Sequence, residues 1–270
     1  MTTASSRPCV LVFAGADPSG GAGVYADVQA IAAVGAHALP VVTVLTVQDN
    51  NRVHAIHSVP VEQVMAQAQA LIDAIPIAAV KIGIVGSRAN AECIAAFLTR
   101  LKIAQPDLPV IVDPVLASGH GDALTREDAL FVLAPLLAHA TLITPNLPEA
   151  ATLCDGLTDA QDQATELFRR GARNVLIKGG HGDGDMVVNR WFYAQGGARS
   201  WQWPRLDGAF HGSGCTLASG IAGLLASGRS TEQAIDEGQA FCQRALETAF
   251  SVGQGQLIPD RTTISIKVPL

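Results

Sequence analysis

Short runs of apolar, β-branched residues alternate along this chain with longer stretches in which apolar residues recur at helical spacing. The first pattern is typical of buried strands and the second of helices packed on a sheet. We predict strands over residues 9–15, 39–48, 79–85, 108–115, 141–145 and 174–181. We predict helices over residues 21–35, 60–75, 87–101, 125–140, 146–153 and 158–172, and two more that begin at positions 212 and 231.

This alternation predicts an α/β fold with a mostly parallel central sheet. Residues 185–206 depart from it, because they form two adjacent strand patterns separated by Gly196 and Gly197. The pattern therefore predicts a small β-hairpin beside the parallel strands. Since no repeat, charge block or Pro/Ser-rich linker interrupts the order, we expect residues 1–270 to form a single domain.

The composition excludes several classes of protein. Hydrophobic residues make up 49% of the chain and charged residues 16%, which permits a large core and argues against disorder. The net charge of -6 leaves no basic surface for nucleic acid or an anionic membrane. We therefore expect neither nucleic acid nor a membrane as a partner.

The cysteines and the N-terminal segment suggest a cellular compartment. The 5 cysteines are scattered without a CxxC pair, so neither a zinc cage nor a disulfide framework is expected. Residues 1–15 lack the layout of a signal peptide, and no run approaches the ~18 apolar residues of a membrane span. We expect a cytoplasmic protein.

Polar residues follow the ends of several predicted strands. In parallel sheets, ligands bind at the carboxyl ends of the strands, where the strand order reverses. Each such residue taken alone has an ordinary alternative as a loop residue, but the repetition favours a site. The residues are Asp17, Gln48, Asp113, Asn146 with Glu149, and Lys178.

The glycine-rich segment GADPSGGAGVYAD, residues 15–27, matches neither common phosphate-binding motif. It lacks the lysine of a Walker A loop and the third glycine of a dinucleotide fingerprint. It predicts a sharp turn into a helix, which lets a flat ligand approach the backbone. Asp27 lies about one turn into that helix, where it can accept a hydrogen bond from the ligand. The alternative is a solvent-facing aspartate that the helix dipole stabilises.

The segment HGSGC, residues 211–215, places a cysteine at the start of a predicted helix. The free backbone N–H groups and the dipole of a helix N-terminus form an anion site, suited to a phosphoryl group in transfer. We expect the same environment to lower the pKa of Cys215, so that its thiolate takes a proton from an attacking alcohol. A buried cysteine that reaches this place by chance is the alternative.

Four motifs together carry a family resemblance: GADPSGGAGVYAD, NLPEA, VLIKGGH and HGSGCTLAS, in this order. They resemble the hydroxymethylpyrimidine/phosphomethylpyrimidine kinases of thiamin biosynthesis, which belong to the ribokinase-like superfamily. The resemblance runs from about Cys9 to the last predicted helix. It implies a three-layer α/β/α fold that phosphorylates a hydroxymethylpyrimidine with ATP and Mg²⁺, and then phosphorylates the monophosphate.

The resemblance also implies roles for individual residues. Cys215 occupies the position of the catalytic base. Gln48 reads the aminopyrimidine edge, because a carboxamide offers both a donor and an acceptor. The remaining residues expected to line the substrate pocket are Gly15, Asp27, Ile84 and Val115, the last two as apolar walls that have ordinary core packing as their alternative.

The phosphate and metal residues are implied in the same way. Asn146 and Glu149 form the N-x-x-E motif, which can hold Mg²⁺ through water and orient the phosphates. Asp113 is a second carboxylate expected near the metal, and Lys178 neutralises phosphate charge. The backbone amides of Gly212, Ser213 and Gly214 complete the expected anion hole.

Two departures from the family pattern matter. Phe210 and Ser213 stand where many members have threonine, and the hydroxyl is retained at Ser213. Members often carry a lysine after the strand that ends in Asp113, whereas no lysine lies here between Lys102 and Lys178. A protonated His120 is a partial substitute. We therefore predict that the second phosphorylation is slower than the first.

Two other functions remain open at this point. A pyridoxal kinase with the same cysteine chemistry acts on a similar flat heteroaromatic alcohol, although Gln48 favours the aminopyrimidine. A non-catalytic pyrimidine-binding regulator on the same scaffold has no need of Asn146, Glu149, Lys178 and Cys215. A requirement for a monovalent cation is not legible in the sequence. From the resemblance we expect a homodimer, for which the hairpin near Trp191 would serve as a contact.

Overall fold

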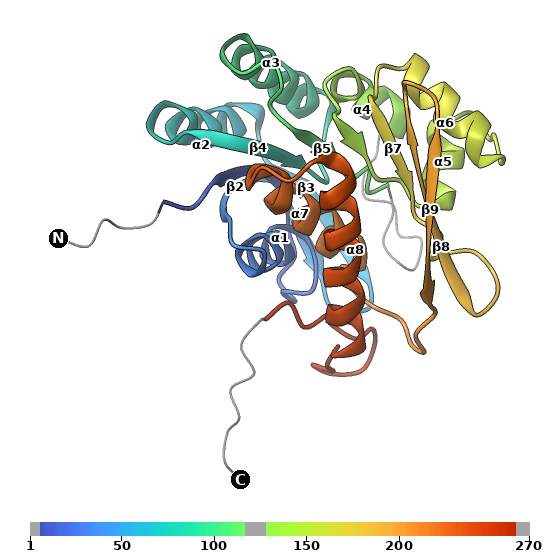
Figure 1. The fold of residues 1–270 in the computed structure, drawn as a ribbon. Coiled ribbons are helices and arrows are strands. Elements are labelled where there is room, and N and C mark those ends of the chain that lie inside the picture. Colours follow the sequence, from blue (N-terminus) through green and yellow to red (C-terminus); the bar gives the residue numbers. More distant parts are fainter. Residues whose placement is uncertain (1–5, 117–127, 263–270) are drawn as a thin grey trace.

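The computed structural model describes residues 6–116 and 128–262 (Figure 1). Within these residues, 9 strands form a single sheet in the order β3-β2-β1-β4-β5-β6-β7-β8-β9. The strands are β1 (Cys9–Ala16), β2 (His37–Gln48), β3 (Val53–Ser58), β4 (Ile77–Ile82), β5 (Val110–Val112), β6 (Leu142–Ile143), β7 (Asn174–Ile177), β8 (Met186–Tyr193) and β9 (Ala198–Pro204).

The middle of the sheet is parallel and its borders are antiparallel. Each neighbouring pair from β2 through β1, β4, β5 and β6 to β7 is parallel. On one border β3 pairs antiparallel with β2, and on the other β8 and β9 form the predicted hairpin beside β7. The predicted α/β fold with a mostly parallel sheet is confirmed.

Helices cover both faces of the sheet (Figure 1). Alternate residues of β1 show why, because side chains along a strand point to opposite faces. Val10 and Val12 belong to the core with α1 (Gly23–Ala33), α7 (Ser213–Ala226) and α8 (Thr231–Glu247). Leu11 and Phe13 belong to the core with the other helices, which are α2 (Val61–Ala74), α3 (Arg88–Ala104), α4 (Ala129–Leu137), α5 (Leu147–Leu153) and α6 (Ala160–Arg169). The three-layer α/β/α arrangement is confirmed.

Strand β3 is the element that sequence patterning missed. Its sequence, VHAIHS, is short and half polar, so it carries no clear strand period. The strand forms because the Asp49 side chain accepts hydrogen bonds from the backbone of Asn51 and Arg52, and this turn brings the chain back along β2. Only the tertiary pairing with β2 identifies it.

Two helix boundaries illustrate how local sequence sets the elements. The Ser87 hydroxyl caps α3 by accepting a hydrogen bond from the Asn90 amide at 3.2 Å. Helix α4 begins at Ala129, after an Asp128 cap, within the helix predicted over residues 125–140. Positions 125–127 of that prediction lie outside the described residues.

The strand order reverses at β1, since β2 and β4 lie on its two sides. The carboxyl ends of the parallel strands meet at one edge of the sheet, where a crevice forms at such a reversal. This edge therefore gathers the residues that follow β1, β2, β4, β5, β6 and β7. No helix among residues 6–116 and 128–262 combines the length and apolar character needed to cross a membrane.

Candidate active site

A cavity of about 170 Å³ opens at the carboxyl ends of the parallel strands, against the first turn of α7. It lies at the switch point where such folds bind ligands. Apart from Asp17 and Asp27, all the described site residues predicted from the sequence line it. These are Gly15, Gln48, Ile84, Asp113, Val115, Asn146, Glu149, Lys178, Gly212, Ser213, Gly214 and Cys215.

A second cavity of about 440 Å³ adjoins the first, between the β8–β9 hairpin and helices α7 and α8. Its apolar walls include Val187, Trp203 and Leu246. The residues common to both cavities are Asn146, Lys178, His181, Phe210, Ser213, Gly214 and Gln256. Two bound molecules, one in each cavity, would therefore meet beside the Lys178 ammonium and the start of α7.

The first turn of α7 presents backbone N–H groups to this junction. Gly212 caps the helix in the left-handed region at φ 82°, where a side chain would be strained. A Cβ atom there would also lie 2.0 Å from the carbonyl oxygen of Gly21. Glycine is therefore required at position 212 for the turn to begin in this place and for two glycine-rich loops to touch.

Cys215 lies within this first turn of α7, but the shift of its pKa is opposite to the prediction. Burial raises the pKa of the Cys215 thiol to about 11, against the effect of the Lys81 ammonium. The backbone N–H of Gly23 hydrogen-bonds the sulfur and favours the thiolate, yet it does not outweigh burial. The expectation of a lowered pKa was wrong because the sequence did not reveal that the side chain is only 9% exposed.

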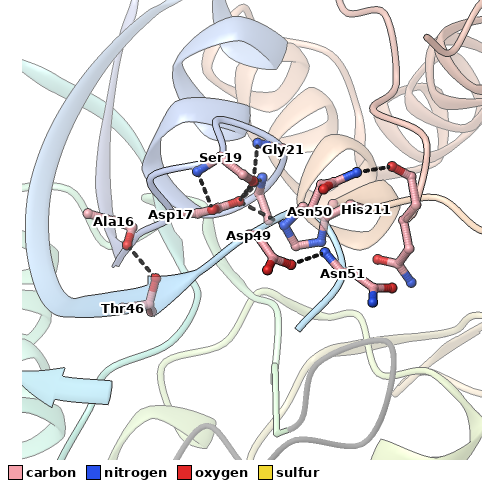
Figure 2. A network of polar contacts seen from close by, with 12 residues as sticks. Ala16, Asp17, Ser19, Gly21, Thr46, Asp49, Asn50, Asn51 and His211 are labelled. Carbon is pink, nitrogen blue, oxygen red and sulfur yellow. Dashed lines mark hydrogen bonds and ion pairs between the residues drawn. The ribbon is translucent and has the colours of Figure 1, made fainter. Parts of the chain in front are cut away.

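Asp17 organises the glycine-rich loop after β1 (Figure 2). Its carboxylate accepts hydrogen bonds from the Ser19 amide at 2.8 Å, the Ser19 hydroxyl at 2.9 Å and the Ala22 amide at 2.7 Å. It also contacts Nε2 of His211 at 2.8 Å. Burial alone would raise the pKa of Asp17, but His211 and Ser19 lower it. The aspartate thus joins the loop before α1 to the loop before α7.

Asp27 does not line either cavity, because its carboxylate is engaged beneath the first one. Both of its oxygens contact the Lys81 ammonium, at 2.8 and 3.0 Å, and Oδ1 also accepts a hydrogen bond from Ser219 at 2.6 Å. Both partners of this ion pair are fully buried. Lys81, which lines the cavity, escaped sequence analysis. The available signal was a lysine inside an apolar strand pattern, AVKIGIV.

Lys178 lies between two carboxylates at the junction of the cavities. Its Nζ is 2.9 Å from Oδ1 of Asp113 and 4.0 Å from Oε2 of Glu149. Burial alone would lower the pKa of Lys178, but these carboxylates raise it, so the side chain stays charged. Burial raises the pKa of Glu149 to about 7, with Lys178 opposing and Asp113 adding to the effect. Of the two carboxylates, Glu149 is the one that takes up a proton near neutral pH.

The Asn146 and Glu149 pair is also a helix cap. The Asn146 side chain accepts from the Glu149 amide at 2.8 Å, and the Glu149 carboxylate accepts from the Asn146 amide at 2.7 Å. This capping box begins α5 and holds both side chains in place. The N-x-x-E spacing therefore has a structural cause in addition to any role in binding.

The oxygen atoms around Lys178 fit a hard divalent cation. Oδ2 of Asp113 is buried and has no hydrogen-bond partner among the described residues, although the side chain lines the first cavity. Such an orphaned oxygen is the kind of ligand that Mg²⁺ prefers. The described residues contain no cluster of three or more His, Cys, Asp or Glu that would hold a metal alone. Mg²⁺ bound by two carboxylates and substrate phosphates suits this donor set.

Solved structures with the same architecture define the class of this protein. The ADP complex of Bacillus subtilis pyridoxal kinase superposes with a TM-score of 0.83 at 26% identity, covering 95% of this chain and 98% of that one. Phosphomethylpyrimidine kinase from Clostridium difficile gives a TM-score of 0.75 at 29% identity, covering 89% of this chain and 100% of that one. The fold is that of a ribokinase-like small-molecule kinase.

The family is narrower than this class. The family model for phosphomethylpyrimidine kinase matches residues 17–260, and the chain belongs to this family. Hydroxymethylpyrimidine/phosphomethylpyrimidine kinase of Streptomyces coelicolor is 40% identical over 255 residues, which are 92% of this chain and 92% of that protein. The predicted family, ribokinase-like fold and phosphotransferase class are confirmed.

Proposed function

We propose that this chain transfers the γ-phosphate of ATP to the hydroxymethyl group of hydroxymethylpyrimidine, and then phosphorylates the monophosphate to the diphosphate, in thiamin biosynthesis. The observation that carries the proposal is the junction of two cavities at Lys178 and Gly214. We assign the smaller cavity to the pyrimidine and the larger to ATP. The names of the relatives support the pyrimidine, and the ADP complex of the Bacillus subtilis protein supports the nucleotide.

In the proposed reaction the hydroxymethyl oxygen attacks the γ-phosphorus of ATP. A new oxygen–phosphorus bond forms while the bond to the bridging oxygen breaks, and ADP leaves with that oxygen. The hydroxyl proton goes to the thiolate of Cys215. The Lys178 ammonium and the backbone N–H groups of residues 212–214 stabilise the charge that develops on the transferred group. Because all these groups line one cavity, they need little rearrangement during the transfer.

We assign Mg²⁺ to the carboxylates of Asp113 and Glu149. When bound, the ion neutralises phosphate charge. The residues of the chain itself hold the carboxylates in place: Thr144 donates a hydrogen bond to Asp113 Oδ1 at 3.0 Å, and the Asn146 amide holds Glu149. A proton on Glu149 competes with the metal, because burial keeps the pKa of this carboxyl at about 7.

The walls of the smaller cavity support a flat heteroaromatic substrate. Ile84 and Val115 contribute apolar surface, and Gly15 allows close approach to the backbone of β1. Gln48 lies at the end of β2, and its carboxamide matches a ring that carries both an amine and a ring nitrogen. In this proposal Asp27 does not contact the ring directly. It acts on the site by holding Lys81 beneath the cavity.

Pyridoxal phosphorylation is the second candidate. The superposition with a pyridoxal kinase favours it, since the acceptor is again a hydroxymethyl group on a flat ring. The Streptomyces coelicolor relative, at 40% identity, favours the pyrimidine. The deciding measurement is ATP consumption with hydroxymethylpyrimidine, its monophosphate or pyridoxal as the acceptor. We expect the highest kcat/KM with the pyrimidines, and a higher value with pyridoxal would reverse the assignment.

The same assay separates a kinase from a silent binding protein. In a Cys215→Ala variant we expect ATP consumption to be lost while the pyrimidine still binds, as measured by calorimetry. Wild-type protein that binds the pyrimidine without consuming ATP would instead support a regulator.

We retain the predictions of one domain over residues 1–270, a cytoplasmic location and a homodimer. The single sheet and the single edge that gathers the site support one domain.

The hairpin contact near Trp191 has little support, because this side chain is 9% exposed and donates a hydrogen bond to Asn174 within the chain. Light scattering on the purified protein measures the mass of the assembly. ATP consumption in potassium and in tetramethylammonium salts tests for a monovalent cation.

A further inference from the structure

Arg261 is a buried charged side chain that neither the family motifs nor the proposed reaction uses. It is 2% exposed and is the largest of the fully buried side chains in the described residues. It lies in the segment that follows α8, one residue beyond the stretch that the family model matches. Burying a guanidinium costs free energy unless its N–H groups are satisfied, so such a residue calls for an explanation.

The guanidinium connects the two glycine-rich loops of the site. One Nη donates to the carbonyl oxygen of Gly21 at 2.6 Å and lies 3.4 Å from that of Gly212. Nε donates to the Thr216 hydroxyl at 2.8 Å, and this hydroxyl in turn donates to the Gly212 carbonyl at 2.8 Å. The other Nη donates to Oε1 of Gln29 at 3.2 Å. Arg261 thus reaches the loop before α1, the cap of α7 and the first turn of α7.

The loops that Arg261 joins are in direct contact. A Cβ atom on Gly21 would lie 2.3 Å from Cδ2 of His211, just as one on Gly212 would overlap the Gly21 carbonyl. The 2.8 Å contact from His211 to Asp17 links the loops on another side (Figure 2). A shift of either loop would therefore displace the N–H groups of residues 212–214, which line the first cavity.

The charge of Arg261 is not cancelled by a direct partner. All the hydrogen-bond acceptors recorded for it among the described residues are neutral: two backbone carbonyls, a hydroxyl and a side-chain amide. In contrast, the Lys81 ammonium is paired directly with Asp27. In a low-dielectric interior an unpaired cation exerts its field over several ångströms. The field of Arg261 falls on the start of α7, where Cys215 lies.

We propose that Arg261 is a positioning residue for phosphoryl transfer: its guanidinium holds the loops at Gly21 and Gly212 together, so that the backbone N–H groups of residues 212–214 stay directed at the transferred phosphate, and its charge favours anions at the start of α7. This proposal rests on the proposed function. Arg261 lies outside the family motifs, and the proposal gives it the role of keeping the anion site within those motifs in its shape. The effect on turnover is expected to exceed the effect on pyrimidine binding, because the phosphate gains charge only during transfer.

Substitution of Arg261 tests both parts of the proposal. Arg261→Met keeps much of the side-chain length and removes the guanidinium N–H donors and the charge, whereas Arg261→Lys keeps the charge. We expect kcat per folded molecule to fall about tenfold or more in Arg261→Met, with KM for the pyrimidine changed less than about threefold. Arg261→Lys should lie between this variant and the wild type. A kcat for Arg261→Met within about twofold of wild type would overturn the proposal.

A substrate-free measurement keeps this test separate from the proposed function. The rate at which iodoacetamide alkylates Cys215, followed by mass spectrometry of its peptide, reports the thiolate fraction. We expect slower alkylation in Arg261→Met at a fixed pH, because loss of the cation disfavours the thiolate. If the wild type phosphorylates nothing but this slowing is observed, the proposed function fails and the electrostatic assignment of Arg261 stands. An alkylation rate in Arg261→Met equal to that of the wild type would refute the electrostatic role of Arg261.

A matched pair of variants at Thr216 keeps the proposal testable if an Arg261 variant does not fold. Thr216→Val removes the hydroxyl between Arg261 and the Gly212 carbonyl, while Thr216→Ser keeps it. We expect kcat to fall severalfold in Thr216→Val and to stay near wild type in Thr216→Ser, whereas equal values for the two would count against the proposal. Arg229→Met is the control for loss of an arginine, because Arg229 is 48% exposed and pairs with Glu237. It should leave both readouts unchanged.

Discussion

The Lys81 ammonium lies 2.8 Å from the Asp27 carboxylate, and both side chains are fully buried below the first cavity. Burial alone would lower the pKa of Lys81, but Asp27, Cys215 and Asp113 raise it, so the lysine stays charged. The pair joins β4 to α1 directly under the cavity floor. Its integrity therefore affects both the stability of the fold and the shape of the site.

Removal of one partner of this pair should be strongly destabilising. We expect Lys81→Met to lower the free energy of unfolding by about 3–5 kcal/mol, because it leaves the Asp27 carboxylate buried without its cation. The double variant Lys81→Met with Asp27→Leu should recover much of this loss, since no charge remains buried. Urea unfolding of the two variants and the wild type measures the difference. A double variant less stable than Lys81→Met would contradict this interpretation.

The proton role of Cys215 predicts a rate that rises with pH. Because burial raises the pKa of the free thiol to about 11, the thiolate fraction increases throughout the accessible alkaline range. Deprotonation of Glu149, with a pKa of about 7, raises the rate at lower pH, so the thiol is tested above that range. We expect kcat/KM still to rise between about pH 8 and about pH 10, and Cys215→Ser to lose both this part of the rise and roughly 10²–10⁴-fold in rate. The measurement is the pH–rate profile of both proteins. Cys93→Ser on α3 is the control, and an identical profile for Cys215→Ser would exclude the proton role.

The unpartnered oxygen of Asp113 predicts a metal dependence. Asp113→Asn removes the charge and should raise the Mg²⁺ concentration needed for half-maximal activity by roughly tenfold or more. Because the metal then loses one of its two assigned carboxylates, the stabilisation against thermal unfolding by ADP and Mg²⁺ should also decrease. Asp159→Asn, a cap on α6, is a charge-matched control. If Asp113→Asn needs the same Mg²⁺ concentration as the wild type, the metal does not bind at Asp113.

The two phosphorylations should differ in rate. No lysine occurs between Lys102 and Lys178, so the phosphate of the monophosphate substrate lacks the cation that the family resemblance leads us to expect there. We expect a lower kcat/KM for the monophosphate than for the alcohol, measured under the same conditions. His120, the substitute considered above, lies outside the described residues. A His120→Ala variant that slows only the second step would support its role, whereas a faster second step in the wild type would refute the prediction.

Much of this protein could be predicted from local sequence signals. The alternation of apolar runs with helical periods identified the parallel strands and the helices, because each pattern follows from the geometry of its own element. Because ligands bind at the carboxyl ends of parallel strands, we expected the residues after the strands to lie together at one edge. The structure has Gln48, Asp113, Asn146 and Lys178 there. Strand β3 was missed, since its polar sequence becomes a strand only by pairing with β2.

Properties that depend on burial and on distant partners were decided by the tertiary structure alone. Asp27 turns away from the cavity because Lys81, 54 positions later in the chain, meets it in the core. The Cys215 thiol has a raised pKa because desolvation outweighs its place near a helix N-terminus. Arg261 reaches Gly21 across 240 positions, and no sequence spacing encodes that contact. Sequence determines which chemical groups are present and on which elements they lie, whereas folding determines how far each group is desolvated and which charge it faces.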